Sequence, residues 1–293
     1  MIPAPWSWTN RVLLLLVAVV WGFNFLFIRE ALADATPLWL ALLRAAIGAG
    51  SAAVLVAAVG GGSHLTGRRR AFAMLLGLPN TAAFYALLFV GIQSVLPGVA
   101  AVLTYTFPFW VALLSPMVLG HRLTSRHWLA IGAGFGGVAL ISEVWSTAGG
   151  AISPLAGIEI LGSAIAWAVG TVVFQRQYAR SEMLEANVFQ LLGGTIALAV
   201  LTALLAPTPW PTLTPAMDGS LLWLGVLGTA VAYSIWFDLL GRTKAATLSA
   251  YVFLVPLVAL VGSALFFGER IAPVQLVGIV LVLASIYGIG RAR

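Results

Sequence analysis

The sequence predicts an all-α membrane protein with ten transmembrane helices, arranged as two inverted five-helix repeats. Three observations predict it: an apolar composition, a division into apolar segments of membrane-spanning length, and a similarity between the two halves of the chain. Of the 293 residues, 61% are apolar and 8% are charged, and the mean hydropathy is +1.04. Because soluble domains carry about 25% charged residues, a soluble globular protein is excluded.

Ten apolar segments are bounded by charged residues, Pro or Gly, and a transmembrane helix needs roughly 20 residues. The stretches between them are too short for an extramembrane domain. The weakest division lies near 91–96, where only a Gly-Ile-Gln-Ser stretch separates the third segment from the fourth, so nine helices are the alternative count. The expected spans are 11–30, 37–59, 70–90, 95–118, 127–142, 154–176, 187–206, 219–239, 246–267 and 272–290.

The positive charges fall almost entirely on one side of this arrangement. Only Arg29 and Arg270 lie on the opposite side, and Arg44 lies within the second span. Because Lys and Arg of short loops accumulate in the cytoplasm, we expect both termini there and a multi-pass protein of the cell inner membrane. The run 68–70 is interpreted as part of this topology signal, and no nucleic-acid partner is expected. The twelve cations assigned to the cytoplasm are Arg11, Arg68, Arg69, Arg70, Arg122, Arg126, Arg176, Arg180, Arg242, Lys244, Arg291 and Arg293.

The chain also contains an internal repeat. A shift of 148 residues aligns 76–131 with 224–279, and a shift of 146 pairs Trp21 with Trp167. We therefore expect one five-helix repeat in 1–147 and a second in 148–293. Five is an odd number, so the second copy enters the membrane from the opposite side, and inverted repeats of this kind are typical of transporters. The matches at the shift of 148 include Gly77 with Gly225, Thr81 with Thr229, Tyr85 with Tyr233, and Pro108 with Pro256.

Short motifs at matching places add a family resemblance. Leu-Gly-His-Arg-Leu at 119–123 and Phe-Gly-Glu-Arg-Ile at 267–271 end the fourth and ninth spans, with Trp-Gly-Phe-Asn at 21–24 and Leu-Leu-Arg-Ala-Ala at 42–46. In these motifs the whole chain resembles the EamA branch of the drug/metabolite transporter superfamily, and within it the YddG exporters of aromatic amino acids. His121 departs from the Gly-Glu of the family pattern, so no carboxylate role is expected in the first half. The resemblance implies a ten-helix metabolite exporter.

Polar and aromatic residues near the middle of the membrane are the candidates for the substrate site. Polar side chains in hydrocarbon are costly and usually face a cavity or another helix. Trp21 and Asn24 are three residues apart and share a helix face, as do Ser163 and Trp167 at a spacing of four. The expected substrate-binding residues are Trp21, Asn24, Asn80, Thr81, Tyr85, Tyr105, Ser163, Trp167 and Tyr233.

Three further residues have two interpretations each. Arg44 lies about 10 Å into the second span by helix rise. Its guanidinium either extends to the interface or packs, or it contacts a substrate carboxylate or the carbonyls of a broken helix. Pro108 and Pro256 stand at matched positions in the fourth and ninth spans, where each is either a static kink or one of a pair of gating hinges.

We therefore expect a transporter that exports small metabolites, mainly aromatic or other apolar amino acids, by alternating access through a central aromatic-lined cavity. Efflux of cationic drug-like compounds is the alternative function, since aromatic walls also bind cations. A membrane sensor or enzyme that transports nothing is a second alternative. Gly-x-Gly-x-x-Gly at 132–137 follows no strand, and the sequence has no catalytic or metal-binding motif. No catalytic residue, metal or cofactor is expected, and the partners are a small-molecule substrate and the lipid bilayer, with a functional monomer.

The charge distribution leads to a labelling prediction. Single cysteines at Gly67 and Gly149 are expected to react with a membrane-impermeant reagent from opposite sides of the membrane, the first only after cells are permeabilised. The chain has no cysteine of its own, so background labelling is absent. Equal labelling of both positions in intact cells contradicts the orientation and the span count.

Overall fold

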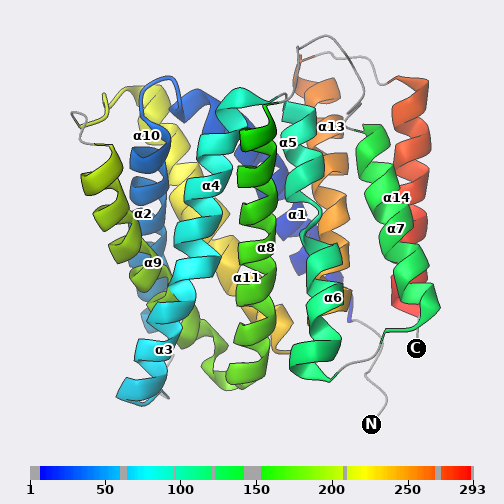
Figure 1. Ribbon diagram of the computed structural model, residues 1–293, viewed down its shortest axis with the longest axis horizontal. Helices are drawn as coiled ribbons and strands as arrows, with labels where there is room; N and C mark the ends of the chain where they lie inside the picture. The colour runs from blue at the N-terminus through cyan, green and yellow to red at the C-terminus, as the bar shows by residue number, and fades with distance from the viewer. Residues whose placement is uncertain are drawn as a thin grey trace.

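The computed structural model describes residues 7–59, 65–95, 97–120, 123–141, 153–206, 210–267 and 272–291. All regular secondary structure in these residues is helical, and the long helices run side by side in one bundle (Figure 1). The predicted all-α class is confirmed for this part of the chain. The expected boundary between the repeats at 147 and 148 lies outside the described residues, as do Gly149, His121 and Arg270.

Several of the predicted spans are composite helices. In the first half, 67–94 joins two α-helices, a π-helix and a 3-10 turn, and the next span is divided at Tyr105 and Thr106. The elements are α1 (Trp8–Ala31), α2 (Pro37–Ala58), α3 (Gly67–Gly77), η1 (Leu78–Ala83), α4 (Phe84–Gly91), η2 (Ile92–Ser94), α5 (Pro97–Thr104), α6 (Phe107–Leu119) and α7 (Ser125–Ile141).

The second half has a similar series of elements. A second π-helix, η5, interrupts one span, and a 3-10 turn, η6, interrupts the next. The elements are α8 (Pro154–Gln177), η4 (Arg180–Glu182), α9 (Met183–Leu205), α10 (Pro215–Leu222), η5 (Trp223–Val231), α11 (Ala232–Leu240), α12 (Ala245–Ala250), η6 (Tyr251–Phe253), α13 (Leu254–Phe267) and α14 (Pro273–Arg291).

Seven helical stretches of the described chain are long and apolar enough to cross a membrane. The expected spans 127–142, 246–267 and 272–290 fall on shorter helices, of which the second is interrupted by η6. The chain is therefore a multi-pass membrane protein. The seven stretches are Trp8–Ala31, Pro37–Ala58, Gly67–Ser94, Val102–Leu119, Pro154–Gln177, Arg180–Leu205 and Pro215–Leu240.

Local sequence explains where several helices begin. The Ser7 hydroxyl accepts a hydrogen bond from the Asn10 amide, and the Thr214 hydroxyl accepts one from the Met217 amide. Both are N-cap bonds that satisfy an amide of the first helical turn. Pro154 and Pro215 occupy the first position of α8 and α10, where the missing N–H costs nothing because that position has no intrahelical acceptor.

The same reasoning applies to the two matched prolines, whose role in gating stays a prediction. Pro108 is the second residue of α6 and Pro256 the third residue of α13. In a first turn a proline removes no intrahelical hydrogen bond. The breaks themselves lie just before, at Tyr105–Thr106 and at η6, so the prolines begin new helical segments rather than kink continuous ones.

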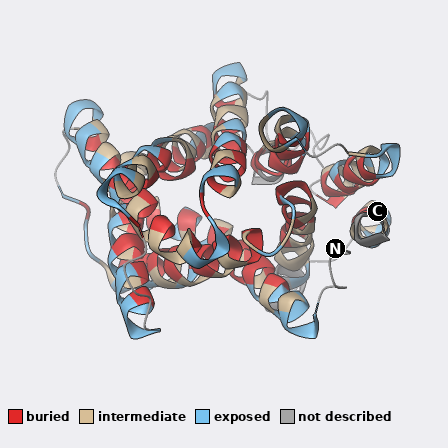
Figure 2. Cartoon of the chain, turned by 90° about the horizontal axis from the view of Figure 1, so that it is seen from below, coloured by how far each residue is buried: buried red, intermediate tan, exposed pale blue. Residues whose placement is uncertain are grey.

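The outer faces of the helices are apolar. Figure 2 shows buried residues on the helix faces that meet neighbouring helices and exposed residues mainly on outward faces and at helix ends. Leu129 and Leu204 are 74% and 71% exposed. Large exposed leucines are expected where lipid rather than water surrounds the protein.

Ion pairs gather at one end of the bundle, which we name the cation-rich end. Arg69 pairs with Glu182 at 2.7 Å, and both Arg180 and Arg242 pair with Asp238.

A buried tyrosine adds a hydrogen bond at the cation-rich end. Burial raises the pKa of the Tyr178 phenol to about 12, so the hydroxyl stays protonated and donates to the Arg69 carbonyl oxygen at 2.7 Å. Helix α1 begins and α14 ends at this same end (Figure 1).

Glycines let pairs of helices approach closely. A methyl group at Gly77 would overlap the Gln190 carbonyl oxygen of α9, and one at Gly194 would overlap the Thr81 side chain. On α7, in contrast, a methyl group at Gly132 would meet nothing within 4 Å. Close contact of small residues is a main source of helix association in membranes.

This packing generates a stability prediction. Gly77→Ala is expected to lower the free energy of unfolding by about 1–3 kcal/mol, the usual cost of overpacking, because the new methyl group meets backbone atoms that cannot rotate away. Gly132→Ala is the control and is expected to leave stability unchanged or slightly higher. Thermal unfolding of both variants in detergent measures the difference, and equal loss in both variants contradicts the packing.

Candidate functional site

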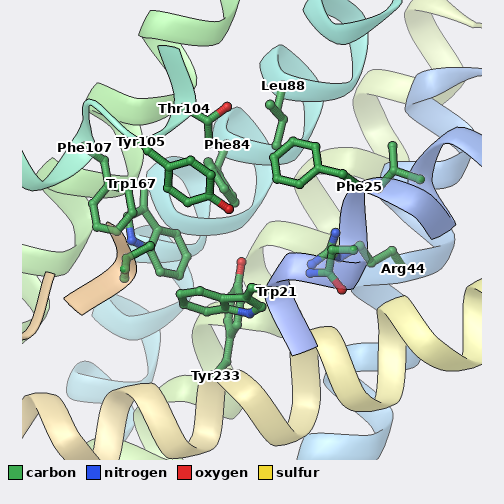
Figure 3. Close-up of a pocket in the computed structure, with 13 residues that line it drawn as sticks. Trp21, Phe25, Arg44, Phe84, Leu88, Thr104, Tyr105, Phe107, Trp167 and Tyr233 are labelled. Carbon is green, nitrogen blue, oxygen red and sulfur yellow. The ribbon is translucent and has the colours of Figure 1, made fainter. Parts of the chain in front are cut away.

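A cavity of about 60 Å³ lies between helices of both halves of the chain. That volume is enough for a few water molecules. Its lining includes Trp21 to Ile28 on α1 and Phe84 to Leu88 on α4, and the helix ends that these residues approach lie away from the cation-rich end (Figure 1). Figure 3 shows most of the lining side chains. Its lining residues are Trp21, Asn24, Phe25, Ile28, Arg44, Phe84, Leu88, Thr104, Tyr105, Phe107, Trp167, Tyr233 and Val252.

Three aromatic rings from three helices form the floor of this cavity. Trp21 of α1 lies 6.1 Å from Trp167 of α8 and 6.0 Å from Tyr233 of α11 between ring centroids, and Trp167 lies 5.0 Å from Tyr233. All three pairs meet edge to face, an arrangement that aromatic side chains favour. The rings converge on one another in Figure 3, so the two Trp residues matched by the repeat meet at a single site.

Arg44 forms one side of the cavity and is 3% exposed. Its Nε donates to the Thr229 hydroxyl at 3.0 Å and its Nη2 donates to the Gly228 carbonyl oxygen at 3.5 Å. Its guanidinium also lies 4.4 Å from the centre of the Tyr85 ring. Hydrogen bonds and a cation–π contact thus offset part of the cost of burying this charge.

In this conformation Arg44 contacts an irregular helix, and its contact with a substrate carboxylate stays a prediction. Its side chain does not extend to the interface, and it binds the backbone of the π-helix η5 through Gly228. No ion pair to Arg44 occurs among the described residues, and the cavity lining contains no carboxylate. The wall of the cavity therefore carries a net positive charge.

The structure brings six of the predicted residues to the cavity: Trp21, Asn24, Arg44, Tyr105, Trp167 and Tyr233. Several polar atoms there have no hydrogen-bond partner in the described residues, namely Trp167 Nε1, the Thr104 hydroxyl and Asn24 Oδ1. These atoms are available to a ligand or to water, because a buried polar group without a partner is costly.

Four predicted residues do not line the cavity in this conformation. The Tyr85 ring packs against the guanidinium of Arg44, and its hydroxyl oxygen lies 3.0 Å from that of Thr229. Ser163 donates to the Ile160 carbonyl oxygen of its own helix at 2.7 Å. Asn80 packs against Gly170 and Thr81 against Gly194, so these two side chains fill helix contacts instead of facing the cavity.

Sequence reasoning missed the apolar part of the lining. Phe25 and Ile28 follow Trp21 by four and seven residues, while Phe84 follows Thr81 and Leu88 follows Tyr85 by three, so helical spacing from the expected residues was the available signal. Phe107 and Val252 carried no signal, because an apolar residue facing a cavity looks the same in sequence as one facing lipid.

The bundle is closed at the cation-rich end. Phe174 and Phe237 lie 4.2 Å apart between ring centroids, directly below the floor of the cavity along α8 and α11. Gln175 donates to the Leu240 and Thr243 carbonyl oxygens and accepts from the Ala245 amide. The cavity is thus separated from the cation-rich end by packed rings and a hydrogen-bonded helix connection.

A multi-pass helical bundle with a polar and aromatic cavity between its two halves is the architecture of a membrane transporter. The EamA-like transporter family model matches the chain twice, over residues 10–143 and 155–291, and the chain belongs to this family. The family points to a transporter and not to an enzyme.

Similar proteins cover nearly the whole chain. A probable amino-acid metabolite efflux pump of Escherichia coli (strain K12) is 29% identical, over 95% of this chain and 93% of that protein. An uncharacterized transporter of Bacillus subtilis (strain 168), YvbV, is also 29% identical, over 94% of this chain and 90% of that protein. A probable terminal-alkyne amino-acid exporter of Streptantibioticus cattleyicolor is 28% identical, over 95% of this chain and 92% of that protein. A crystal structure with 16% identity shares the fold, with a TM-score of 0.79 over 96% of this chain and 97% of that one.

The cavity geometry generates a prediction for Trp167. Trp167→Ala is expected to reduce flux of an aromatic substrate at least several-fold, since one aromatic pair contributes about 0.5–1.5 kcal/mol beyond its buried area and this ring contacts both Trp21 and Tyr233. Trp210→Ala is the control, because Trp210 is 59% exposed and outside the cavity. Flux into proteoliposomes at equal protein content is the measurement, and equal flux of both variants contradicts the site.

Proposed function

We propose that this chain exports small metabolites across the cell inner membrane, with aromatic and other apolar amino acids as the principal substrates. The observation that carries the proposal is the buried Arg44 guanidinium in an aromatic cavity whose lining contains no carboxylate. Such a wall attracts the carboxylate of a substrate and repels an isolated cation, and both effects are stronger away from water.

A zwitterionic amino acid matches the remaining groups of the cavity. Its carboxylate can approach the guanidinium of Arg44, which has five N–H donors and uses two of its nitrogens on Thr229 and Gly228. An apolar or aromatic side chain can pack on Trp21 and Trp167, and the ammonium can meet a ring face or Asn24 Oδ1.

The similar proteins support the same substrate class. Two of them are named for amino acids: the probable amino-acid metabolite efflux pump and the probable terminal-alkyne amino-acid exporter. The resemblance to YddG exporters adds the aromatic side chain. The chemistry of the cavity is an independent reason for the same substrate class.

Efflux of cationic compounds is the second candidate, and the aromatic walls favour it. Arg44 opposes it, because a like charge at the cavity wall disfavours a cation that has no carboxylate of its own. A sensor or enzyme in the membrane would use the same helices without net movement of substrate, so measured flux separates it from both transport candidates.

We further propose ten transmembrane spans in two inverted repeats, 1–147 and 148–293, with both termini in the cytoplasm and a functional monomer. Adding 148 to the bounds of η1 gives 226–231, which falls inside η5, and the same shift takes the Tyr105 break to Phe253 of η6. These recurring irregularities support a duplicated unit. In this orientation the cation-rich end faces the cytoplasm and the cavity lies toward the opposite side.

Alternating access then requires the helices around the cavity to change their arrangement between two states. We propose that Pro108 and Pro256 contribute by beginning α6 and α13 directly after a break, because a proline at that place allows adjacent segments to bend without losing a hydrogen bond. Each proline then serves the gate of its own repeat.

A counterflow assay tests the substrate class. Proteoliposomes loaded with unlabelled tryptophan, phenylalanine or leucine are expected to accumulate the labelled amino acid, whereas loading with a nucleobase or a cationic dye produces no uptake. The matching amino-acid amide, which lacks the carboxylate, is expected to compete poorly. Equal competition by the amide, or counterflow with dyes only, rejects the amino-acid proposal.

Arg44 is tested by Arg44→Gln, which keeps a polar side chain and removes the charge. Flux of an amino acid is expected to fall about ten- to hundredfold, in line with about 1.5–3 kcal/mol for a hydrogen bond to a charged group. Arg126→Gln, at an exposed position outside the cavity, is the matched control. A similar loss in both variants removes Arg44 from the proposed site.

A further inference from the structure

The two π-helices make equivalent contacts with equivalent partners. Gly48 of α2 packs against Thr229 of η5, and Gly194 of α9 packs against Thr81 of η1. Thr229 follows Thr81 by 148 residues and Gly194 follows Gly48 by 146. This contact of α2 with η5 is therefore repeated between α9 and η1, as a duplicated unit requires.

At η5 this arrangement is held by hydrogen bonds from Trp21, Arg44 and Tyr85, which we name the η5 latch. Trp21 Nε1 donates to the Gly228 carbonyl oxygen at 3.1 Å, and Arg44 Nε donates to the Thr229 hydroxyl at 3.0 Å. The Tyr85 and Thr229 hydroxyl oxygens are also 3.0 Å apart, and Thr229 donates to the Leu224 carbonyl oxygen at 2.8 Å. The π-helix presents both Gly228 and Thr229 to side chains from α1, α2 and α4.

At η1 the equivalent groups are present, but the equivalent bonds are not formed. In the repeat, Trp167 is the counterpart of Trp21 and Gln190 is the counterpart of Arg44. Tyr233 corresponds to Tyr85, and Thr81 corresponds to Thr229. In the described residues, Trp167 Nε1, Gln190 Oε1 and the Thr81 hydroxyl are all buried without a partner. Gln190 Nε2 instead donates to Asn187 Oδ1 at 3.0 Å.

This asymmetry has a physical explanation in a two-state protein. A buried donor or acceptor without a partner is costly, and native structures contain few of them. At η1 the groups equivalent to Trp21, Arg44 and Thr229 have atoms without partners, whereas at η5 those three side chains are bonded to one another or to the helix. A second conformation could form the bonds at η1 and break the bonds at η5. The two conformations would then be similar in free energy, because each would have one bonded and one unbonded site.

We propose that η5 and η1 are reciprocal latches of alternating access, a mechanism that rests on the proposed transport function. In the described conformation the η5 latch is formed. In the opposite conformation Trp167 donates to the Asn80 carbonyl, and Tyr233 and Gln190 bind the Thr81 hydroxyl, while the η5 latch opens. Arg44 then loses Thr229 and Gly228, and its free N–H groups bind the carboxylate of the substrate.

The proposal assigns Arg44 two alternating partners. When the η5 latch forms, Thr229 and Gly228 compete with the substrate carboxylate for the guanidinium, and the substrate is released into the cavity that lies away from the cation-rich end. Gln190, the counterpart of Arg44, carries no charge, so only one of the two latches competes for a carboxylate. Release is thereby coupled to one side of the membrane.

The test uses the accessibility of single cysteines without substrate. Leu88→Cys reports on the cavity that it lines, and Thr171→Cys reports on the closed side, because Thr171 is fully buried one turn below Trp167 on α8. In the otherwise cysteine-free parent, Leu88→Cys is expected to react and Thr171→Cys to be protected.

Thr229→Val and Thr81→Val each remove one hydroxyl at equivalent positions. Thr229→Val is expected to raise the ratio of labelling at 171 to labelling at 88 about two- to tenfold, the effect of losing one or two hydrogen bonds. Thr81→Val is expected to lower that ratio or to increase the protection of 171. Thr229→Ser and Thr81→Ser keep the hydroxyl and are expected to restore the parent ratio.

Shifts in the same direction, or no shift in either variant, overturn the latch. Trp21→Phe and Trp167→Phe form a second pair that removes only the indole N–H, and these variants must repeat the opposite shifts. Because no substrate is present, absence of amino-acid flux with intact opposite shifts rejects the substrate class and leaves the latch. Amino-acid flux in the parent without any opposite shifts rejects the latch alone.

Discussion

In the hydrocarbon of a membrane every backbone N–H and C=O must be paired inside the protein, because an unpaired group costs several kcal/mol. The long helices of this bundle meet that constraint by their own hydrogen bonds. Departures from the α-helix are therefore informative, and here they gather around one place: η1, η5, η6 and the break at Tyr105–Thr106 all lie on spans that surround the cavity. At η5 the side chains of Trp21 and Arg44 bind a backbone carbonyl, so the irregular helix and the polar site stabilise each other.

The chemistry of the cavity follows from the same cost of burying polar groups. Most of the wall consists of rings, which offer large contact area without a charge to desolvate. The single guanidinium is kept by two hydrogen bonds and by the face of Tyr85. A cavity with one buried positive charge and aromatic walls suits a substrate that brings a carboxylate and an apolar side chain, which is why the proposed substrate class rests on Arg44 more than on any other residue.

Duplication explains the shape of the site, and divergence between the halves explains its polarity. Asn24 contacts Gly228 across one interface, and Asn80 contacts Gly170 across the equivalent one, with the two residue types exchanged. Arg44 and Gln190 likewise occupy equivalent positions with different charge. Equivalent positions of the two halves therefore carry side chains of different size and charge.

Much of this protein was determined by the sequence alone. Composition and segment length define an all-α, multi-pass membrane protein, and the shifts of 148 and 146 residues relate Trp21 to Trp167 and Tyr85 to Tyr233. Those signals are local or periodic, so they can be recognised in the sequence without knowledge of the fold. The polar candidates Asn24, Arg44 and Tyr105 were also accessible, because a polar side chain in an apolar segment needs a special environment.

Only the tertiary structure decided which candidates face the cavity. Asn80, Thr81 and Ser163 were indistinguishable in sequence from Asn24, yet they fill helix contacts or bond to their own helix. Phe107 and Val252 line the cavity without any sequence signal, and the π-helices have no residue pattern that predicts them. The reason is physical: the direction of a side chain in a membrane bundle depends on helix rotation and on close contacts between distant segments, and neither is encoded in a single span.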